Sequence, residues 1–346
     1  MSAHAESVEF ASWFGLVLLA TAAACEPIDR KLGELSLPAT SDAESGDAVA
    51  TQELGEPEVV FRDDSRVNSG LWVSDDGEVW IAGYEPSTGA VARGFVALLV
   101  EDRLQLKTTQ SSELRSVWSC DGGTVHAVGG ITTHSAEWLP SRSPSGGLLR
   151  DVWGADCDNL VAVGDDGAIA RYDGSEWALV DEKPTAAHLH SVWGTSADNI
   201  FAVGNNGTIV RFDGTAWSLV ESGRDVDLLG VWGVSEIEFY AVGGRKNGEQ
   251  AVVLEYNGRI WQEAAHFDGF QLHAVHGDRS GRVLAVGGQP NPDQSFAAVL
   301  QRGDAWSETI VRGLPSLNDV WIGTSSDALA VGERGVVIRI PVDGGD

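Results

Sequence analysis

Basic residues are scarce in this sequence. Lysine and arginine total 23 among 346 residues, against 51 aspartates and glutamates, so the formal net charge is −28 at pH 7. A field of that sign repels nucleic acid and anionic membrane surfaces. We therefore expect no nucleic-acid partner, and membrane contact only through an N-terminal lipid anchor.

Motifs of catalysis and cofactor binding are missing as well. The chain has no G-x-S-x-G nucleophile elbow, no phosphate loop and no paired-cysteine motif, and its histidines after residue 25 show no metal-ligand spacing. We interpret the VGDDG run at Val163–Gly167 as turn residues that a hairpin demands rather than as calcium ligands. We expect no catalytic residue, no cofactor and no metal site.

An apolar run of 15 residues without a charge, Phe10–Ala24, lies near the N-terminus. It is short for a membrane span but has the length of a signal-peptide core. The sequence AAAC that ends at Cys25 resembles a bacterial lipobox, although Ala22 stands where leucine is usual and residues 1–9 contain no lysine or arginine. The resemblance implies that residues 1–25 are a signal peptide and that Cys25 carries lipid. The alternatives are ordinary signal cleavage and an uncleaved N-terminal anchor.

Residues 26–56 contain no aromatic side chain. They include eight acidic and two basic residues, a composition that cannot bury enough apolar surface to fold alone. We interpret this segment as a flexible acidic linker, such as a lipid-anchored domain needs between itself and the membrane. Residues 57–346 are left for the folded domain.

The remaining sequence contains an internal repeat. A VWG-like anchor recurs seven times at intervals of 35 to 46 residues, and 11 residues later each copy has a glycine that ends an AVG-like run. This fixed spacing indicates a β-hairpin, because a one-residue change would turn every side chain to the other face. The anchors are Trp72, Trp118, Trp153, Trp193, Trp232, His276 and Trp321, and the glycines are Gly83, Gly129, Gly164, Gly204, Gly243, Gly287 and Gly332.

Two further strands complete each unit. The segment Thr208–Val220, TIVRFDGTAWSLV, contains a strand, an Asp-Gly turn and a strand that carries tryptophan. Asp-Gly and Asn-Gly favour the two-residue type I′ hairpin, with positive φ at both central residues. Four hairpin-linked strands per repeat are typical of a propeller blade. We predict an all-β fold, a seven-bladed β-propeller of four-stranded antiparallel blades.

The unit after Trp321 lacks a fourth strand, whereas the orphan strand EVVF, Glu58–Phe61, precedes the first anchor. We predict that this N-terminal strand completes the last blade. The ring then closes without an unpaired edge inside it.

The innermost strand of each blade carries a regular pattern. Leucine lies four residues before the anchor in six copies, and a small or short residue lies two before it, as in Leu189, Ser191 and Trp193. Alternation with period 2 predicts that these three side chains share one face. The small residues let seven strands converge on an axis, and we expect each tryptophan to pack between adjacent blades.

The consensus VWG…N(I/L)xAVG(D/N)(D/N)G…(Y/F)DGxxW, over roughly residues 65–341, resembles the tandem-repeat propellers of bacterial secreted proteins and lipoproteins. Such propellers are described as sialidase-like or photosystem-assembly-factor-like. The resemblance implies the fold but no single function, because propellers include enzymes, lectins and scaffolds. The sialidase Asp-box has only a partial counterpart at Ser119–Val125, so no catalytic residue is carried over.

Cys120 and Cys157 each lie between the first two strands of neighbouring repeats, the second and the third. Both therefore belong to the same rim of the predicted ring. An exported chain permits a disulfide, which forms only if the two Cα atoms lie within about 7 Å. We treat the two cysteines as a candidate pair.

The residue three positions before the anchor differs from copy to copy. This position lies where loops emerge at one mouth of the channel, so its variation is the best indication of a binding site. Longer segments follow Gly83, Gly243 and Gly287 on the same rim and would raise walls around it. We predict a partly cationic rim that takes an anionic or carboxylate-bearing ligand; the alternative is that its bases only offset local acidic charge. The candidate rim residues are Arg115, Arg150, His190, His273 and Asn318.

These observations favour a non-catalytic propeller, not an enzyme, that binds or scaffolds an extracellular or envelope protein or glycan. We expect a monomer that is exported to the bacterial cell envelope or beyond. The alternative is a sialidase-like glycoside hydrolase, which needs acids, a tyrosine and an arginine gathered at one mouth.

Overall fold

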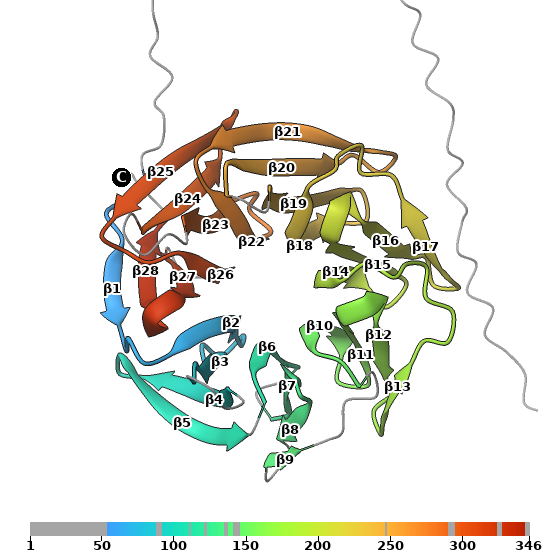
Figure 1. Ribbon diagram of the computed structural model, residues 1–346, viewed down its shortest axis with the longest axis horizontal. Coiled ribbons are helices and arrows are strands. Elements are labelled where there is room, and N and C mark those ends of the chain that lie inside the picture. The colour runs from blue at the N-terminus through green and yellow to red at the C-terminus, as the bar shows by residue number, and fades with distance from the viewer. Residues whose placement is uncertain are drawn as a thin grey trace, which may run out of the picture. The chain divides into compact units, whose positions relative to one another are not determined.

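The computed structural model describes residues 54–87, 92–110, 112–120, 123–134, 138–140, 146–245, 248–289, 295–323 and 327–342. Seven four-stranded antiparallel sheets surround a common axis (Figure 1), which confirms the predicted seven-bladed β-propeller. The predicted signal peptide, Cys25 and most of the predicted linker lie outside the described residues. No helix among those described is long and apolar enough to cross a membrane.

In six blades the strands run outward from the axis in chain order, and in the last blade β26, β27 and β28 are followed on the outside by β1 (Figure 1). The innermost strands are β2 (Val67–Val73), β6 (Leu114–Ser119), β10 (Leu149–Asp156), β14 (Leu189–Ser196), β18 (Asp227–Ser235), β22 (Gln271–Gly277) and β26 (Leu317–Ile322). The second strands are β3 (Val79–Glu85), β7 (Val125–Gly129), β11 (Asn159–Gly164), β15 (Asn199–Gly204), β19 (Glu238–Gly244), β23 (Val283–Gln289) and β27 (Asp327–Gly332).

The outer half of each blade contains the remaining strands. The third strands are β4 (Arg93–Val100), β8 (Thr132–His134), β12 (Ile169–Tyr172), β16 (Ile209–Phe212), β20 (Gln250–Tyr256), β24 (Phe296–Arg302) and β28 (Val337–Pro341). The outermost strands are β5 (Arg103–Gln110), β9 (Trp138–Pro140), β13 (Trp177–Leu179), β17 (Trp217–Val220), β21 (Trp261–Asp268), β25 (Trp306–Arg312) and β1 (Glu58–Phe61). Three short 3₁₀ turns, η1 (Asp165–Gly167), η2 (Asn205–Gly207) and η3 (Glu333–Gly335), join second to third strands.

The ring closes through the N-terminal strand, as the sequence predicted. Strand β1 pairs antiparallel with β28, so the last blade combines both ends of the described chain. Glu58 faces Arg339 across this pair, and their side chains form an ion pair of 3.3 Å. Pairing strands from the two ends means that the last blade cannot form until most of the chain is in place.

Every innermost strand contains a β-bulge three residues before its anchor. In the fourth blade the pairing shifts between Leu189 and Ser191, so His190 is the extra residue, and the same shift recurs in the other six blades. The prediction that Leu189, Ser191 and Trp193 share one face is therefore wrong, because a bulge reverses the alternation. The leucine packs in the blade core and does not line the channel, whereas the small residue and the tryptophan both contribute to the channel lining.

The glycine that ends each AVG-like run lies opposite the bulge. A Cβ atom on Gly204 would collide with the backbone carbonyl oxygen of His188, and the corresponding collision occurs in all seven blades. Gly204 has φ of −163°, which is extended backbone that any residue can adopt. In this blade the glycine is therefore required for close packing rather than for its freedom in φ, and the same packing in all seven blades accounts for the constant 11-residue spacing.

The two kinds of glycine turn differ in conformation. Asp166 and Gly167 both have positive φ, and the Ala168 N–H donates to the Asp165 carbonyl oxygen, which defines a type I′ turn. The Asp-Gly pair between third and fourth strands does not form this turn, because Gly174 has positive φ but Asp173 does not. The Asp173 carboxylate instead accepts hydrogen bonds from the amides of the next two residues after the glycine, which lowers its pKa to about 2.

The anchor tryptophans pack between neighbouring blades. The ring of Trp118 lies over Gly154 of the next blade, Trp153 lies over Gly194, and each leaves no room there for a side chain. The indole N–H of Trp193 donates to the carbonyl oxygen of Gly233, again one blade further on, at 2.9 Å. Each tryptophan thus stabilises an interface rather than the blade to which it belongs.

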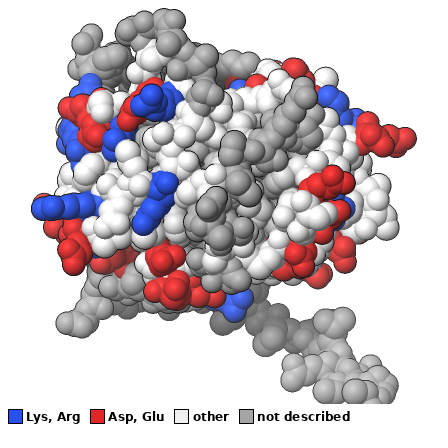
Figure 2. Space-filling model, turned by 90° about the horizontal axis from the view of Figure 1, so that it is seen from below, with Lys and Arg blue, Asp and Glu red and all other residues white. Residues whose placement is uncertain are grey.

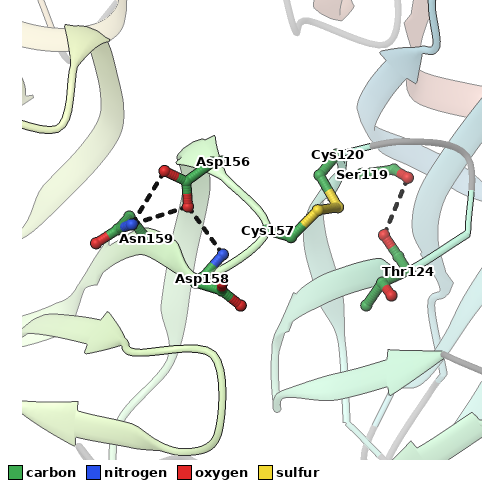
Figure 3. The surroundings of a disulfide bond; sticks show 7 residues. All are labelled: Ser119, Cys120, Thr124, Asp156, Cys157, Asp158 and Asn159. Atoms are coloured by element: carbon green, nitrogen blue, oxygen red, sulfur yellow. Dashed lines mark hydrogen bonds between the residues drawn. A yellow bond between two sulfur atoms is a disulfide. The ribbon is translucent and has the colours of Figure 1, made fainter. Parts of the chain in front are cut away.

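A disulfide joins the second and third blades (Figure 3). Cys120 and Cys157 are bonded with a Cα–Cα distance of 5.3 Å, well within the range that a disulfide spans. Cys157 lies in the turn between β10 and β11, directly after β10. The second blade has the shortest outer strands, with three residues each in β8 and β9, so the covalent link fastens the blade that has the least strand pairing.

One flank of the ring carries acidic and basic side chains in mixture. Figure 2 shows lysine and arginine scattered among aspartate and glutamate on this face, with acidic side chains along its rims. The excess of acids is therefore spread over the visible described surface rather than gathered into one lobe.

Replacing Gly204 by alanine tests the packing of the bulge. We expect Gly204→Ala to lower the free energy of unfolding by about 3 kcal/mol or more, because the new methyl group overlaps a backbone atom that cannot move alone. Urea denaturation measures the effect. The matched control is Gly303→Ala, whose Cβ would meet nothing nearer than 3.7 Å and which should leave stability within about 1 kcal/mol. Equal effects of the two changes would contradict the packing argument.

Removing the disulfide should destabilise the ring. The bond closes a loop between residues 37 apart, for which chain entropy gives a contribution of about 2–4 kcal/mol. We expect the Cys120→Ser/Cys157→Ser double variant to unfold at correspondingly lower urea concentration. A reducing agent should shift the wild type toward the double variant and leave the double variant unchanged; a wild type insensitive to complete reduction would show that the bond adds no stability.

Candidate functional site

The seven bulged residues gather at one mouth of the central channel. Together with Val67, Tyr84 and Glu333 they line a cavity of about 180 Å³. A bulge removes a residue from the ladder and redirects its side chain, which explains why this position is free to vary between copies. The bulged residues are Ser69, Arg115, Arg150, His190, Leu229, His273 and Asn318.

The structure thus brings together all five rim residues that the sequence predicted. The sequence reasoning missed Tyr84 and Glu333, each of which follows the glycine of an AVG-like run. A signal was present, because the residue after that glycine lies beside the bulged residue of the same blade. The pairs Arg150 with Asp165 and His190 with Asn205 are in contact on this pattern.

Both arginines of the mouth have acidic partners. The guanidinium of Arg115 forms an ion pair with Glu113 and lies 4.8 Å from the ring centre of Tyr84. The guanidinium of Arg150 lies 2.7 Å from the carboxylate of Asp165. The expectation of a partly cationic mouth therefore needs correction: these partners balance both positive charges, as the alternative interpretation proposed.

The histidines and the asparagine add polar groups but no positive charge at neutral pH. His190 contacts the side-chain oxygen of Asn205 at 2.6 Å, and His273 donates to the Leu317 carbonyl oxygen at 2.8 Å. Burial lowers the pKa of both histidines. The amide of Asn318 donates to the Asn68 carbonyl oxygen at 2.9 Å.

Two hydrogen-bond donors in this cavity have no partner. The hydroxyl of Ser69 and the Nε of Arg115 are both shielded from solvent, and neither atom contacts an acceptor among the residues that the structure describes. Buried donors are seldom left unsatisfied, because each costs about 1–3 kcal/mol. Both residues line the mouth, so a small rotation of either side chain would present its donor to an oxygen acceptor that enters there.

Below the mouth, short polar side chains join adjacent blades. Asp151 accepts a hydrogen bond of 2.8 Å from the Val192 amide of the next blade, and Asp319 accepts one of 2.7 Å from the Leu71 amide. Ser191 repeats the pattern by accepting from Val231 at 3.2 Å. Burial and the charge of Asp151 raise the pKa of Asp319 to about 8, so this carboxyl group is largely protonated at neutral pH.

The anchor side chains form an aromatic floor under these groups. Trp193 of the fourth blade lies 6.4 Å from Trp321 of the seventh and 5.5 Å from His276 of the sixth, measured between ring centres. His276 stacks on Trp321 at 4.1 Å, and its Nδ1 accepts a hydrogen bond from the Ile322 amide. A ligand at the mouth therefore meets an aromatic barrier rather than an open pore.

The longer segments after Gly83, Gly243 and Gly287 are described only in part. Residues 88–91, 246–247 and 290–294 of these segments lie outside the described residues, so the predicted walls stay a prediction. Within the described ranges, no group of three or more His, Cys, Asp or Glu side chains is arranged to hold a metal ion.

The fold and the mouth together define a seven-bladed β-propeller with a polar axial pocket. No known family profile matches the chain, and no curated protein matches it in sequence. Solved structures do match: the RRP9 WD40 repeats have a TM-score of 0.64 at 10% identity, and the match covers 84% of this chain and 99% of the solved WD40-repeat chain. At such identity the likeness shows the fold alone.

Two other solved propellers are similar to the same degree. YCF48 from Cyanidioschyzon merolae has a TM-score of 0.61 at 13% identity and covers 82% of this chain and 98% of its own. A catalytically inactive virginiamycin B lyase from Staphylococcus aureus, with quinupristin, has a TM-score of 0.62 at 11% identity and covers 84% of this chain and all of its own.

The protonation of Asp319 should appear in the pH dependence of stability. Its folded-state pKa of about 8 lies above the unfolded value near 4, so unfolding releases a proton and this group's contribution falls as pH rises between those values. As pH rises through that range, we expect Asp319→Asn to become more stable relative to the wild type, by at most about 1.4 kcal/mol per pH unit. Urea denaturation at about pH 5 and pH 8 measures the difference.

The control for this experiment is Asp213→Asn, in an exposed turn. The pKa of Asp213 is lowered to about 2 by hydrogen bonds to its carboxylate, so its titration lies below the tested range. Its stability relative to wild type should stay constant between the two pH values. A parallel offset for Asp319→Asn would show that Asp319 is ionised throughout.

Proposed function

We propose that this propeller is a binding or scaffold protein whose axial mouth recognises an acidic partner. The observation that carries the proposal is the pair of buried donors, the Ser69 hydroxyl and the Arg115 Nε, that have no acceptor among the described residues. A carboxylate of a protein or glycan would satisfy both. Because the two arginines already have acidic partners, affinity would depend on hydrogen-bond geometry more than on net charge.

The proposal also covers location. The lipobox-like sequence at Cys25, the acidic segment 26–56 and a domain with a disulfide are mutually consistent with an exported lipoprotein, because disulfides persist in oxidising compartments. A rigid ring held by a long tether would present its mouth to partners at some distance from the membrane.

A glycoside hydrolase is the second candidate, and one observation favours it. Tyr84 and Arg115 line the mouth, and Glu113 forms an ion pair with Arg115, so an acid, a tyrosine and an arginine come together as a sialidase-like site needs. Burial raises the pKa of Tyr84, however, which makes its hydroxyl harder to ionise and a poorer nucleophile. Release of fluorophore from sialosides by the wild type, lost in Tyr84→Phe, would establish the enzyme.

The binding proposal is tested by removing both mouth arginines. We expect Arg115→Gln/Arg150→Gln to weaken binding to acidic glycans or acidic peptides on an array by roughly tenfold or more, because hydrogen bonds between charged groups contribute about 1.5–3 kcal/mol each. The matched control, Arg259→Gln/Arg279→Gln, removes the same charge from two exposed turns away from this cavity and should bind as the wild type does.

Two results would contradict the proposal. If both double variants weaken binding equally, only the overall charge matters. If the wild type binds acidic and neutral probes alike, the mouth does not select carboxylates. Thermal unfolding of each variant shows whether the ring remains intact.

A further inference from the structure

A second, larger groove lies off the axis between the fourth and fifth blades. Its volume is about 620 Å³, within the range of roughly 300–1,000 Å³ that is usual for small-molecule sites. The wall on one side is residues 223–226 of the connection from β17 to β18 with Asp227, the first residue of β18, and on the other side it is Arg245 with Gln250 of β20. None of its lining residues belongs to the axial mouth.

The groove has an apolar floor. Val252 is 2% exposed and Val226 is 9% exposed, and both pack in the core of the fifth blade. Buried valines at the base and polar groups at the walls are the usual composition of a ligand pocket. A ligand in the groove would therefore contact apolar side chains below it and charged side chains beside it.

Two of the acidic groups in the wall are already engaged. The carboxylate of Glu263 lies 2.8 Å from the guanidinium of Arg224, and it also contacts His266. The carboxylate of Asp227 accepts a hydrogen bond of 3.0 Å from the Asn206 amide. These contacts hold the turn η2 and strand β21 in the walls of the groove. Because both carboxylates already accept hydrogen bonds, they are less available to bind a ligand.

Two opposite charges remain unengaged. The guanidinium of Arg245 and the carboxylate of Asp225 are both exposed, and neither has an ion-pair or side-chain hydrogen-bond partner within the described part of the chain. The side-chain amide of Gln250 is likewise without a partner there. The groove thus offers one cationic and one anionic contact above an apolar floor.

We propose that this groove binds a zwitterion, a ligand with a carboxylate and an ammonium group, as in a free amino acid or the end groups of a short peptide. Arg245 would take the carboxylate through two parallel N–H bonds, and Asp225 would take the ammonium group. A neutral ligand would form neither charged hydrogen bond, and a polyanion would be repelled by Asp225, Asp227 and Glu263.

Equilibrium dialysis with a mixed-sequence tripeptide library tests the proposal. The library is supplied in three forms, with both ends free, with an acetylated N-terminus and with an amidated C-terminus, beside a mixture of free amino acids. We expect the form with free ends to bind, and each capped form to bind roughly tenfold more weakly, because each cap removes one charged hydrogen-bonding group. Binding by the free amino acids identifies the smaller source.

Variants assign each end of the ligand to one residue. Arg245→Gln should weaken binding of free-ended peptides but not weaken the amidated form further, because that form has no carboxylate to lose. Asp225→Asn should show the same relation to the acetylated form. The matched control Arg259→Gln, in an exposed turn of the same blade, should bind as the wild type does.

Some outcomes would overturn the proposal. They are equal binding of capped and free peptides, no detectable binding at millimolar peptide, and equal effects of Arg245→Gln on the free and amidated forms. Both substituted residues are exposed, so thermal unfolding should be unchanged and loss of binding will not reflect loss of fold. The axial double variant Arg115→Gln/Arg150→Gln should bind these peptides normally, which separates the two sites.

Discussion

The rest of the ring depends on one close approach, between the glycine of each AVG-like run and the backbone carbonyl five residues before the anchor, at the start of the innermost strand. In the fourth blade these atoms belong to Gly204 and His188, and no side chain can enter between them. The approach is possible because the innermost strand bulges at the next position but one, at His190. Bulge and glycine therefore form a unit, and a chain that keeps one must keep the other.

This constraint separates structure from recognition. The residues that pair in the ladder repeat from blade to blade because packing fixes them, whereas the bulged residue has no ladder partner and varies. Arg150, His190 and Asn318 occupy equivalent positions but contact different groups at the mouth. A repeat architecture can in this way keep seven identical frames and still build one asymmetric pocket.

Particular residues show how far the sequence could predict the result. The closing strand Glu58–Phe61 was found as an orphan, and it lies where the count of strands required. The prediction that Leu189 and Trp193 share one face was wrong, because the periodicity of the sequence alone cannot reveal a bulge between them. The type I′ turn expected for the Asp-Gly pairs between third and fourth strands does not form at Asp173. The Asp173 carboxylate instead stabilises the loop by accepting a hydrogen bond from a backbone amide. The prediction of a partly cationic mouth was wrong because Glu113 and Asp165 form ion pairs with its two arginines.

The sequence by itself determined the number of blades, their order and the ring closure, because the 11-residue spacing repeats seven times and the strand missing from the last repeat matches the orphan strand Glu58–Phe61. It also placed the variable position at a rim. Only the tertiary structure decided that Tyr84 and Glu333 join the five predicted rim residues there, and which charges remain free. The reason is physical: strand pairing depends on local periodicity, whereas the ion pairs of Arg115 and Arg150 and the free charges of Arg245 and Asp225 depend on how loops from different blades come together in space.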